Sequence, residues 1–96
     1  MYLLHIEHSV PDYEAWRRNG FDSDPLGRQK MGVLRHRVGR RTDDLNHVMI
    51  DLEFATSEDA ERMAAALKQM WVGAEARGLI RTPELTSFTL VDSVEY

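Results

Sequence analysis

The chain has 96 residues, of which 43% are hydrophobic and 29% charged, and its formal net charge is -4. This length predicts one domain, residues 1–96, with a single core. The acidic balance argues against nucleic acid as a partner, because phosphate binding needs a basic patch. The absence of cysteine excludes disulfides, a thiol nucleophile and thiolate metal ligands. No apolar stretch reaches the length that spans a bilayer and no basic segment precedes one, so we expect a cytoplasmic protein with no membrane contact.

The first ten residues alternate in character, which predicts a strand. Its more apolar face carries Tyr2, Leu4, Ile6, His8 and Val10. Pro11 then ends the strand, because proline cannot extend a central ladder but suits the start of a helix. A short helix is expected over residues 12–19, with Tyr13 and Trp16 at helical spacing, and Phe21 is expected to plug the core behind it.

A second short helical segment is predicted between Asp24 and Gly32. Asp24 followed by Pro25 resembles an N-cap followed by a first helical position, and Gly32 is a left-handed stop.

Two long alternating runs between residues 32 and 54 predict a hairpin of antiparallel strands, because turn formers fill residues 42–46 between them. One face of this hairpin carries Leu34, His36, Val38, Val48, Ile50, Leu52 and Phe54. The other face carries Arg35, Arg37, Asp51 and Glu53, with Val33 and Met49 among them.

The turn of this hairpin sets its register. If the turn is centred on residues 43–45, the numbers of facing residues sum to about 88. Arg37 then lies opposite Asp51, and Arg35 lies opposite Glu53.

The remaining chain predicts a long helix and a last strand. The helix begins after Thr56 and ends between Gly73 and Gly78, with an apolar stripe of Ala60, Met63, Ala64, Leu67, Met70, Trp71 and Ala74. The last strand is expected over residues 86–95, with Phe88 and Leu90 on its apolar face.

The resulting order of elements, β-α-β-β-α-β, predicts an α+β ferredoxin-like sandwich with one four-stranded antiparallel sheet and both helices on one face. The residues expected beneath the helices are Leu4, Ile6, Leu34, Val38, Ile50, Leu52, Phe88 and Leu90. The opposite face carries Val33, Met49 and Val91 among charges. That mixture suits a partner sheet better than water, so we expect a homodimer through this face.

Short motifs spread over nearly the whole chain carry a family resemblance. They are Pro11-Asp12-Tyr13 with Trp16, Phe21-Asp22, Asp24-Pro25-Leu26-Gly27-Arg28, Gly32-Val33, Arg40, Asp43-Asp44 and Val48-Met49-Ile50-Asp51-Leu52-Glu53-Phe54. Together they are similar to a small uncharacterised bacterial family of the dimeric α/β-barrel superfamily, which is antibiotic-biosynthesis-monooxygenase-like. The resemblance implies a homodimer whose two sheets close face to face, with the helices outside.

The superfamily hosts several activities, so the resemblance specifies architecture better than chemistry. Its haem-degrading members bind iron through a histidine that follows a tryptophan in the sequence. No histidine follows Trp71 here, so the resemblance does not favour haem degradation. Its quinone-forming monooxygenases act without cofactors and use tryptophan, asparagine, arginine and tyrosine. Trp16, Trp71, Tyr13 and Asn19 supply suitable residue types.

Candidate site residues lie on the apolar face and the helices. We select His36 as the catalytic candidate, because a histidine near neutral pKa on that face can act as a base; the alternative is a structural histidine, as also for His8. His5 is expected in a polar network on the other face. The ligand-binding candidates are Tyr13, Trp16, Met70 and Trp71, with plain core packing as the alternative.

No metal or cofactor is expected, because the histidines lie on different strands or faces. The predicted function is a pocket for a small apolar or aromatic molecule, with cofactor-independent monooxygenase activity. The alternatives are a non-catalytic small-molecule-binding or assembly module and a polyketide-type cyclase, and the sequence alone does not decide whether the chain is an enzyme. A polar group converging inside the pocket is the feature that discriminates between them.

Overall fold

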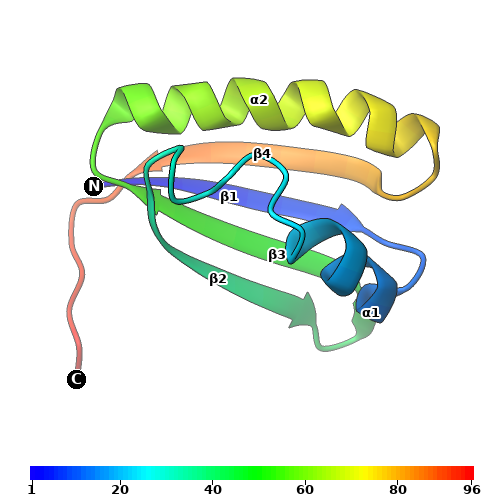
Figure 1. Ribbon diagram of the computed structural model, residues 1–96. Helices are drawn as coiled ribbons and strands as arrows, with labels where there is room; N and C mark the ends of the chain where they lie inside the picture. The colour runs from blue at the N-terminus through cyan, green and yellow to red at the C-terminus, as the bar shows by residue number, and fades with distance from the viewer.

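The computed structural model describes residues 1–96. Its elements are β1 (Tyr2–Ser9), α1 (Tyr13–Trp16), a π-helical turn η1 (Arg17–Phe21), β2 (Val33–Arg41), β3 (Asp44–Phe54), α2 (Ser57–Ala76) and β4 (Arg81–Thr89). The strands form one antiparallel sheet in the order β2-β3-β1-β4. The long α2 lies along one face of the sheet, and α1 lies near one end (Figure 1). The predicted ferredoxin-like α+β fold is confirmed. No helix is long and apolar enough to cross a membrane.

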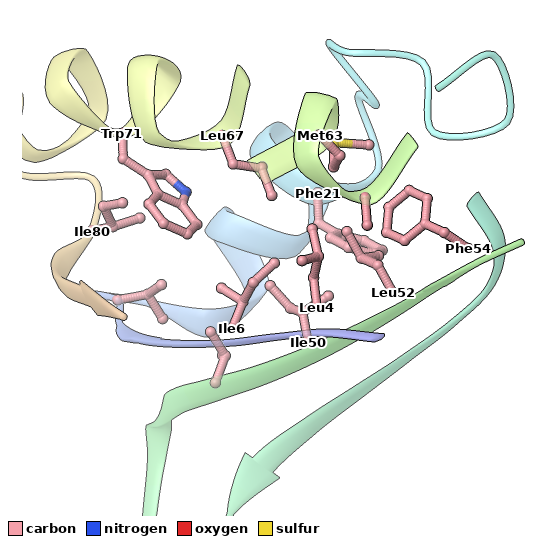
Figure 2. Packing of buried hydrophobic residues seen from close by; sticks show 13 residues of the cluster. Leu4, Ile6, Phe21, Ile50, Leu52, Phe54, Met63, Leu67, Trp71 and Ile80 are labelled. Carbon is pink, nitrogen blue, oxygen red and sulfur yellow. The ribbon is translucent and has the colours of Figure 1, made fainter. Parts of the chain in front are cut away.

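The α2 helix supplies most of the cover over the sheet. Its N-cap is Thr56, whose side chain accepts a hydrogen bond from the Asp59 amide at 3.2 Å. Its buried residues are Ala60, Met63, Leu67 and Trp71, one stripe at helical spacing. They point down onto Leu4 and Ile6 of β1 and Ile50 and Leu52 of β3 (Figure 2).

The predicted first helix is only partly regular. Asp12 caps α1 by accepting hydrogen bonds from the amides of Glu14 and Ala15 at 3.0 and 3.4 Å. The chain then widens into η1, where the Asp22 amide donates to the Arg17 carbonyl, five residues earlier, at 2.9 Å. Phe21 closes this turn and is buried in the core, as the sequence predicted.

The helix predicted between Asp24 and Gly32 is absent, and the segment forms successive turns instead. Asp24 and Gly27 have φ values of 49° and 71°, both in the left-handed region, so no helical turn can propagate through them. Gly32, with φ of 95°, has the Asp59 carboxylate where a Cβ would stand, so this glycine is required by space as well as by conformation.

The register of the β2–β3 hairpin is the one predicted. Arg37 pairs with Asp51 and Arg35 with Glu53. The Arg35 Nε and Glu53 Oε2 atoms are 3.3 Å apart, and Arg37 Nη2 lies 3.7 Å from Asp51 Oδ2. Both ion pairs lie on the face away from α2.

The hairpin departs from the prediction at two places. Arg41 pairs with Asp44, so the turn lies at residues 42–43 rather than being centred on 43–45, and the register shifts after Arg40. The other departure is at Leu34. Val33 pairs with Phe54, and the register shifts between Val33 and Arg35, so a β-bulge takes Leu34 out of alternation. Leu34 is therefore 58% exposed rather than beneath the helices, and Val33 packs against the core in its place.

Reversal of the Asp51 charge tests the paired arrangement. Asp51→Lys is expected to destabilise the protein, because it places a second positive charge opposite Arg37. The new charge also stands at a position where the side chain is nearly buried. Adding Arg37→Glu should recover part of the loss, with a coupling energy of about 0.2 to 1 kcal/mol because Arg37 is largely in water. A double-mutant cycle in urea measures it, and zero coupling would contradict the pairing.

The last strand begins earlier than predicted, at Arg81, and ends at Thr89. Pro83 lies within it, which is tolerated because β4 is an edge strand of the sheet. Its register with β1 sets Leu85 opposite Ile6 and Phe88 opposite Leu3. Phe88 was predicted beneath the helices, but it lies on the other face and is 48% exposed. Leu90, also predicted there, lies beyond the strand.

We call the sheet face opposite α2 the open face. It carries Arg35, Arg37, Met49, Asp51, Glu53, Leu3, His5, Glu7, Thr86 and Phe88.

Candidate functional site

A cavity of about 390 Å³ lies between the sheet, α2 and η1 with the turns that follow it. We call it the α2 cavity. Its walls are mostly apolar: they include Ile6, Ile50 and Leu52 from the sheet, Met63, Leu67, Met70, Trp71 and Ala74 from α2, and Trp16 and Phe21 from α1 and η1. Figure 2 shows the side chains of Trp71 and Leu67 pointing from α2 toward the sheet, where Ile6 and Ile50 lie.

The structure brings three of the four predicted ligand-binding residues together. Trp16, Met70 and Trp71 all line the α2 cavity. Tyr13 does not line the cavity; its ring centroid is 5.8 Å from that of Trp16, and the Arg40 guanidinium lies over its ring at 4.0 Å. Tyr13 therefore supports the Trp16 indole without reaching the cavity.

His8 is the one titratable side chain that is buried in the cavity wall, with 2% of its surface exposed. Its ring stands edge-on to Trp16 at a centroid distance of 5.6 Å. Desolvation lowers its pKa below the usual 6.5, against a small opposing effect of its hydrogen bond with the Ser9 backbone. His8 is therefore a neutral imidazole at neutral pH.

The hydrogen bond of His8 identifies its tautomer. Nδ1 lies 3.4 Å from the Ser9 carbonyl oxygen, which can only accept, so we assign the proton to Nδ1. Nε2 then keeps a free lone pair and has no protein partner. An imidazole nitrogen in this state can accept a proton or a hydrogen bond from a molecule in the cavity.

His36, the catalytic candidate from the sequence, does not line the α2 cavity. Its ring stands edge-on to Phe21, with the two centroids 5.1 Å apart. It is exposed in a shallow polar depression with Arg28 and Arg35. Burial and then the nearby Arg28 charge lower its pKa. Among the aromatic side chains, His36 thus packs against Phe21 and not against the predicted ligand-binding residues Trp16 and Trp71.

Sequence reasoning placed His8 and His36 on the same sheet face, which is correct, but it preferred His36 because it did not use the strand order. The signal that favours His8 is its position in a central strand, since β1 has neighbours on both sides whereas β2 is an edge. A histidine on a central strand lies deeper under the covering helix.

Charged side chains stand around the cavity. The Arg28 guanidinium lies over the Phe21 ring at 3.9 Å, donates to the Phe21 carbonyl at 2.9 Å and lies 3.7 Å from Asp24. Asp24 also accepts from the Arg28 amide at 2.9 Å. Arg77, directly after α2, is exposed and also lines the cavity.

A separate polar network occupies the open face. His5 bridges Asp51 and Glu7 at 2.7 and 2.8 Å, and Glu7 also binds His47 at 2.8 Å. The hydrogen bond with Glu7 is the largest cause that raises the His5 pKa. His5 thus takes part in a polar network, as the sequence predicted. No three histidine or carboxylate side chains lie where they could share a metal ion.

Comparison with solved structures identifies related folds. A provisionally assigned antibiotic biosynthesis monooxygenase from Deinococcus radiodurans aligns over 100% of this chain and 98% of its own, with a TM-score of 0.75 and 14% identity. A variant of SnoaB, a cofactor-independent oxygenase from Streptomyces nogalater, aligns over 99% and 97% with a TM-score of 0.73 and 18% identity. A dimeric ferredoxin-like protein from an uncultured marine organism aligns over 97% of both chains, with a TM-score of 0.72 and 12% identity.

No protein-family model and no curated protein sequence matches the chain. At identities this low, the structural likeness speaks to the fold and not to the activity. The chain therefore has the ferredoxin-like fold that antibiotic-biosynthesis-monooxygenase-like proteins and dimeric ferredoxin-like proteins share.

Proposed function

We propose that this protein is a homodimer in which each subunit binds a small apolar or aromatic molecule in the α2 cavity and oxidises it as a cofactor-independent monooxygenase. The observation that carries the proposal is His8, a buried imidazole in the wall of the cavity, which its lowered pKa keeps neutral and whose Nε2 has no hydrogen-bond partner within the protein. Such a group converging on the cavity favours chemistry over passive binding, since a mere binding pocket needs no base.

The cavity suits a flat apolar ligand. Its volume of about 390 Å³ falls at the lower end of the range of small-molecule sites. Two indoles, Trp16 and Trp71, line it and offer aromatic faces and edges to a ring system. The ligand-binding roles proposed for Trp16, Met70 and Trp71 rest on this arrangement, with Tyr13 holding Trp16 in place.

The proposed reaction starts with a proton transfer to His8. Nε2 removes a proton from a ring methylene made acidic by its aromatic neighbours, which leaves a carbanion in the cavity. The carbanion is oxidised by O₂, so that one oxygen atom becomes the carbonyl of the product and the other leaves in water, while His8 gives its proton back. A methylene and O₂ thus become a ketone and water, and the protein needs to supply only a base and an apolar enclosure.

The proposed dimer forms through the open face. This face exposes Phe88 of the edge strand β4 next to Leu3 of β1, and it holds the network of His5, Glu7 and Asp51 whose polar groups are already paired. Paired charges beside apolar side chains suit a second sheet, because no lone charge would be enclosed. Fold relatives described as dimeric give further support. We expect light scattering at micromolar concentration to give twice the chain mass, and a monomer mass would contradict the dimer.

Ligand binding and oxygen uptake test the proposed activity. The chain has two tryptophans and both line the cavity, so a bound aromatic molecule should quench the intrinsic fluorescence saturably. Among ligands that quench, those with an acidic ring methylene should consume O₂ in proportion to the ketone formed. Saturable quenching without O₂ uptake, but with ring closure of a polyketide chain, would assign a cyclase. Binding without any turnover would leave a non-catalytic module.

A further inference from the structure

We infer that the natural ligand of the α2 cavity is an acid whose carboxylate is received by the Arg77 guanidinium at the mouth, while its apolar body lies between the two indoles. The inference rests on the proposed binding in this cavity and specifies the class of molecule that enters it.

The charge balance around the cavity is the first observation. The whole chain has a net charge of -4, yet the residues that line this cavity include two arginines and a single carboxylate, Arg28, Arg77 and Asp24. An acidic protein thus places an excess of positive charge around this apolar cavity. Apolar walls strengthen the field of such charges, because they exclude the water that would screen it.

Arg28 and Asp24 are already occupied, which leaves Arg77. Arg28 is held by the Phe21 ring, the Phe21 carbonyl and Asp24. Arg77, in contrast, has no carboxylate within ion-pair distance and its side chain donates no hydrogen bond within the protein. Its Nη1 lies 3.9 Å from where a Cβ of Gly73 would stand. No side chain at position 73 therefore crowds the guanidinium.

Arg77 lies where it can bind the carboxylate of a ligand at the mouth of the α2 cavity. It is exposed, as is the neighbouring lining residue Leu79, whereas His8 is buried. A ligand that met both groups would carry its carboxylate near the solvent and its reacting carbon in the interior. The guanidinium presents parallel donors that match both oxygens of a carboxylate, which fixes orientation as well as affinity.

A purely structural role for Arg77 is the competing explanation. Cations near the C-terminal end of a helix interact favourably with its partial negative charge, and Arg77 directly follows Ala76, the last residue of α2. In that case its removal would lower stability but would leave the choice between ligands unchanged. The test must therefore measure ligand preference rather than binding or stability alone.

The experiment compares 2-naphthoate with its neutral analogue 2-naphthamide by quenching of the tryptophan fluorescence. The wild type is expected to bind the acid at least about tenfold more tightly than the amide, because the hydrogen bonds to Arg77 are charge-assisted. Arg77→Gln should abolish that preference and leave the affinity for the amide unchanged. Arg18→Gln, which removes an exposed arginine that does not line the cavity, should retain the preference.

Three outcomes would overturn the inference. Equal affinity of the wild type for acid and amide would remove the acid subsite but keep the cavity as a binding site. Retention of the preference in Arg77→Gln would show that another group receives the carboxylate or that the role of Arg77 is structural. Absence of saturable quenching by either probe would reject the cavity as a binding site, and with it the proposed function.

Discussion

Replacement of His8 with glutamine is expected to lower turnover by about 100-fold to 10,000-fold, the usual contribution of a positioned general base. Glutamine keeps a polar side chain of similar reach but cannot take a proton at Nε2. Affinity for the ligand should change much less, because the walls of the cavity are apolar and remain in place. Oxygen uptake under saturating ligand measures turnover, and fluorescence quenching measures affinity.

His36→Gln provides the matched comparison, because the sequence favoured that histidine as the base. His36 does not line the cavity, so this change should have a far smaller effect on turnover than the change at His8. A larger loss at His36 than at His8 would reverse the assignment and return it to the prediction from the sequence.

The lowered pKa of His8 has a consequence for the pH profile. The base is active when neutral, so turnover should hold as pH falls below 6.5, the ordinary histidine value, and decline only at the lower pKa of the buried ring. The His8→Gln variant should lack this acid limb.

The same histidine affects stability, and the sign follows from proton uptake. As pH falls, the unfolded chain binds a proton at His8 near pH 6.5, whereas the folded chain binds it only at a lower pH. The contribution of neutral His8 to the free energy of unfolding is therefore full above pH 6.5 and is lost as pH falls toward the folded pKa. His5 has the opposite sign. Its pKa is raised, so its stabilisation is present below 6.5 and is lost as pH rises through the folded value.

The central hairpin was predictable because several local signals agree on it. Alternation assigns the faces and predicts the register that sets Arg37 against Asp51. The turn itself lies earlier than predicted, at residues 42–43, and a register shift after Arg40 reconciles it with that pairing. The bulge that exposes Leu34 left no comparable signal, because Val33 and Leu34 are both apolar and either can fill the core position opposite Phe54.

The edge strand and the site were less predictable for a different reason. The last strand was predicted to begin at residue 86, whereas β4 begins at Arg81 and runs through Pro83. An edge strand tolerates proline, and only the assembled sheet identifies β4 as an edge. The choice between His8 and His36 likewise depends on strand order. Alternation places both under the helices, while their depth is decided by which strand is central. Which strand is central depends on pairing between strands that are far apart in the sequence, such as β1 with β4.

Trp71→Ala is expected to lower the free energy of unfolding by about 3 kcal/mol, toward the lower end of the range for large aromatic residues. The indole is 8% exposed and packs in the core with Leu67 and Ile80, so truncation removes many contacts. One side of it already borders the α2 cavity, so fewer contacts are lost there. Val72→Ala, next to it on α2 but 71% exposed, is the control and should change stability by less than about 0.5 kcal/mol.

Ligand binding separates the two roles of Trp71. If the indole forms a wall of a working cavity, Trp71→Ala should weaken binding of an aromatic ligand as well as stability, with the remaining Trp16 reporting the quench. Trp71→Phe, which keeps a smaller aromatic face, should recover part of both. A variant that loses stability but binds the ligand with unchanged affinity would show that Trp71 serves the core alone. In that case the ligand would have to stack on Trp16, whose indole is held between Tyr13 and Phe21 on the opposite wall.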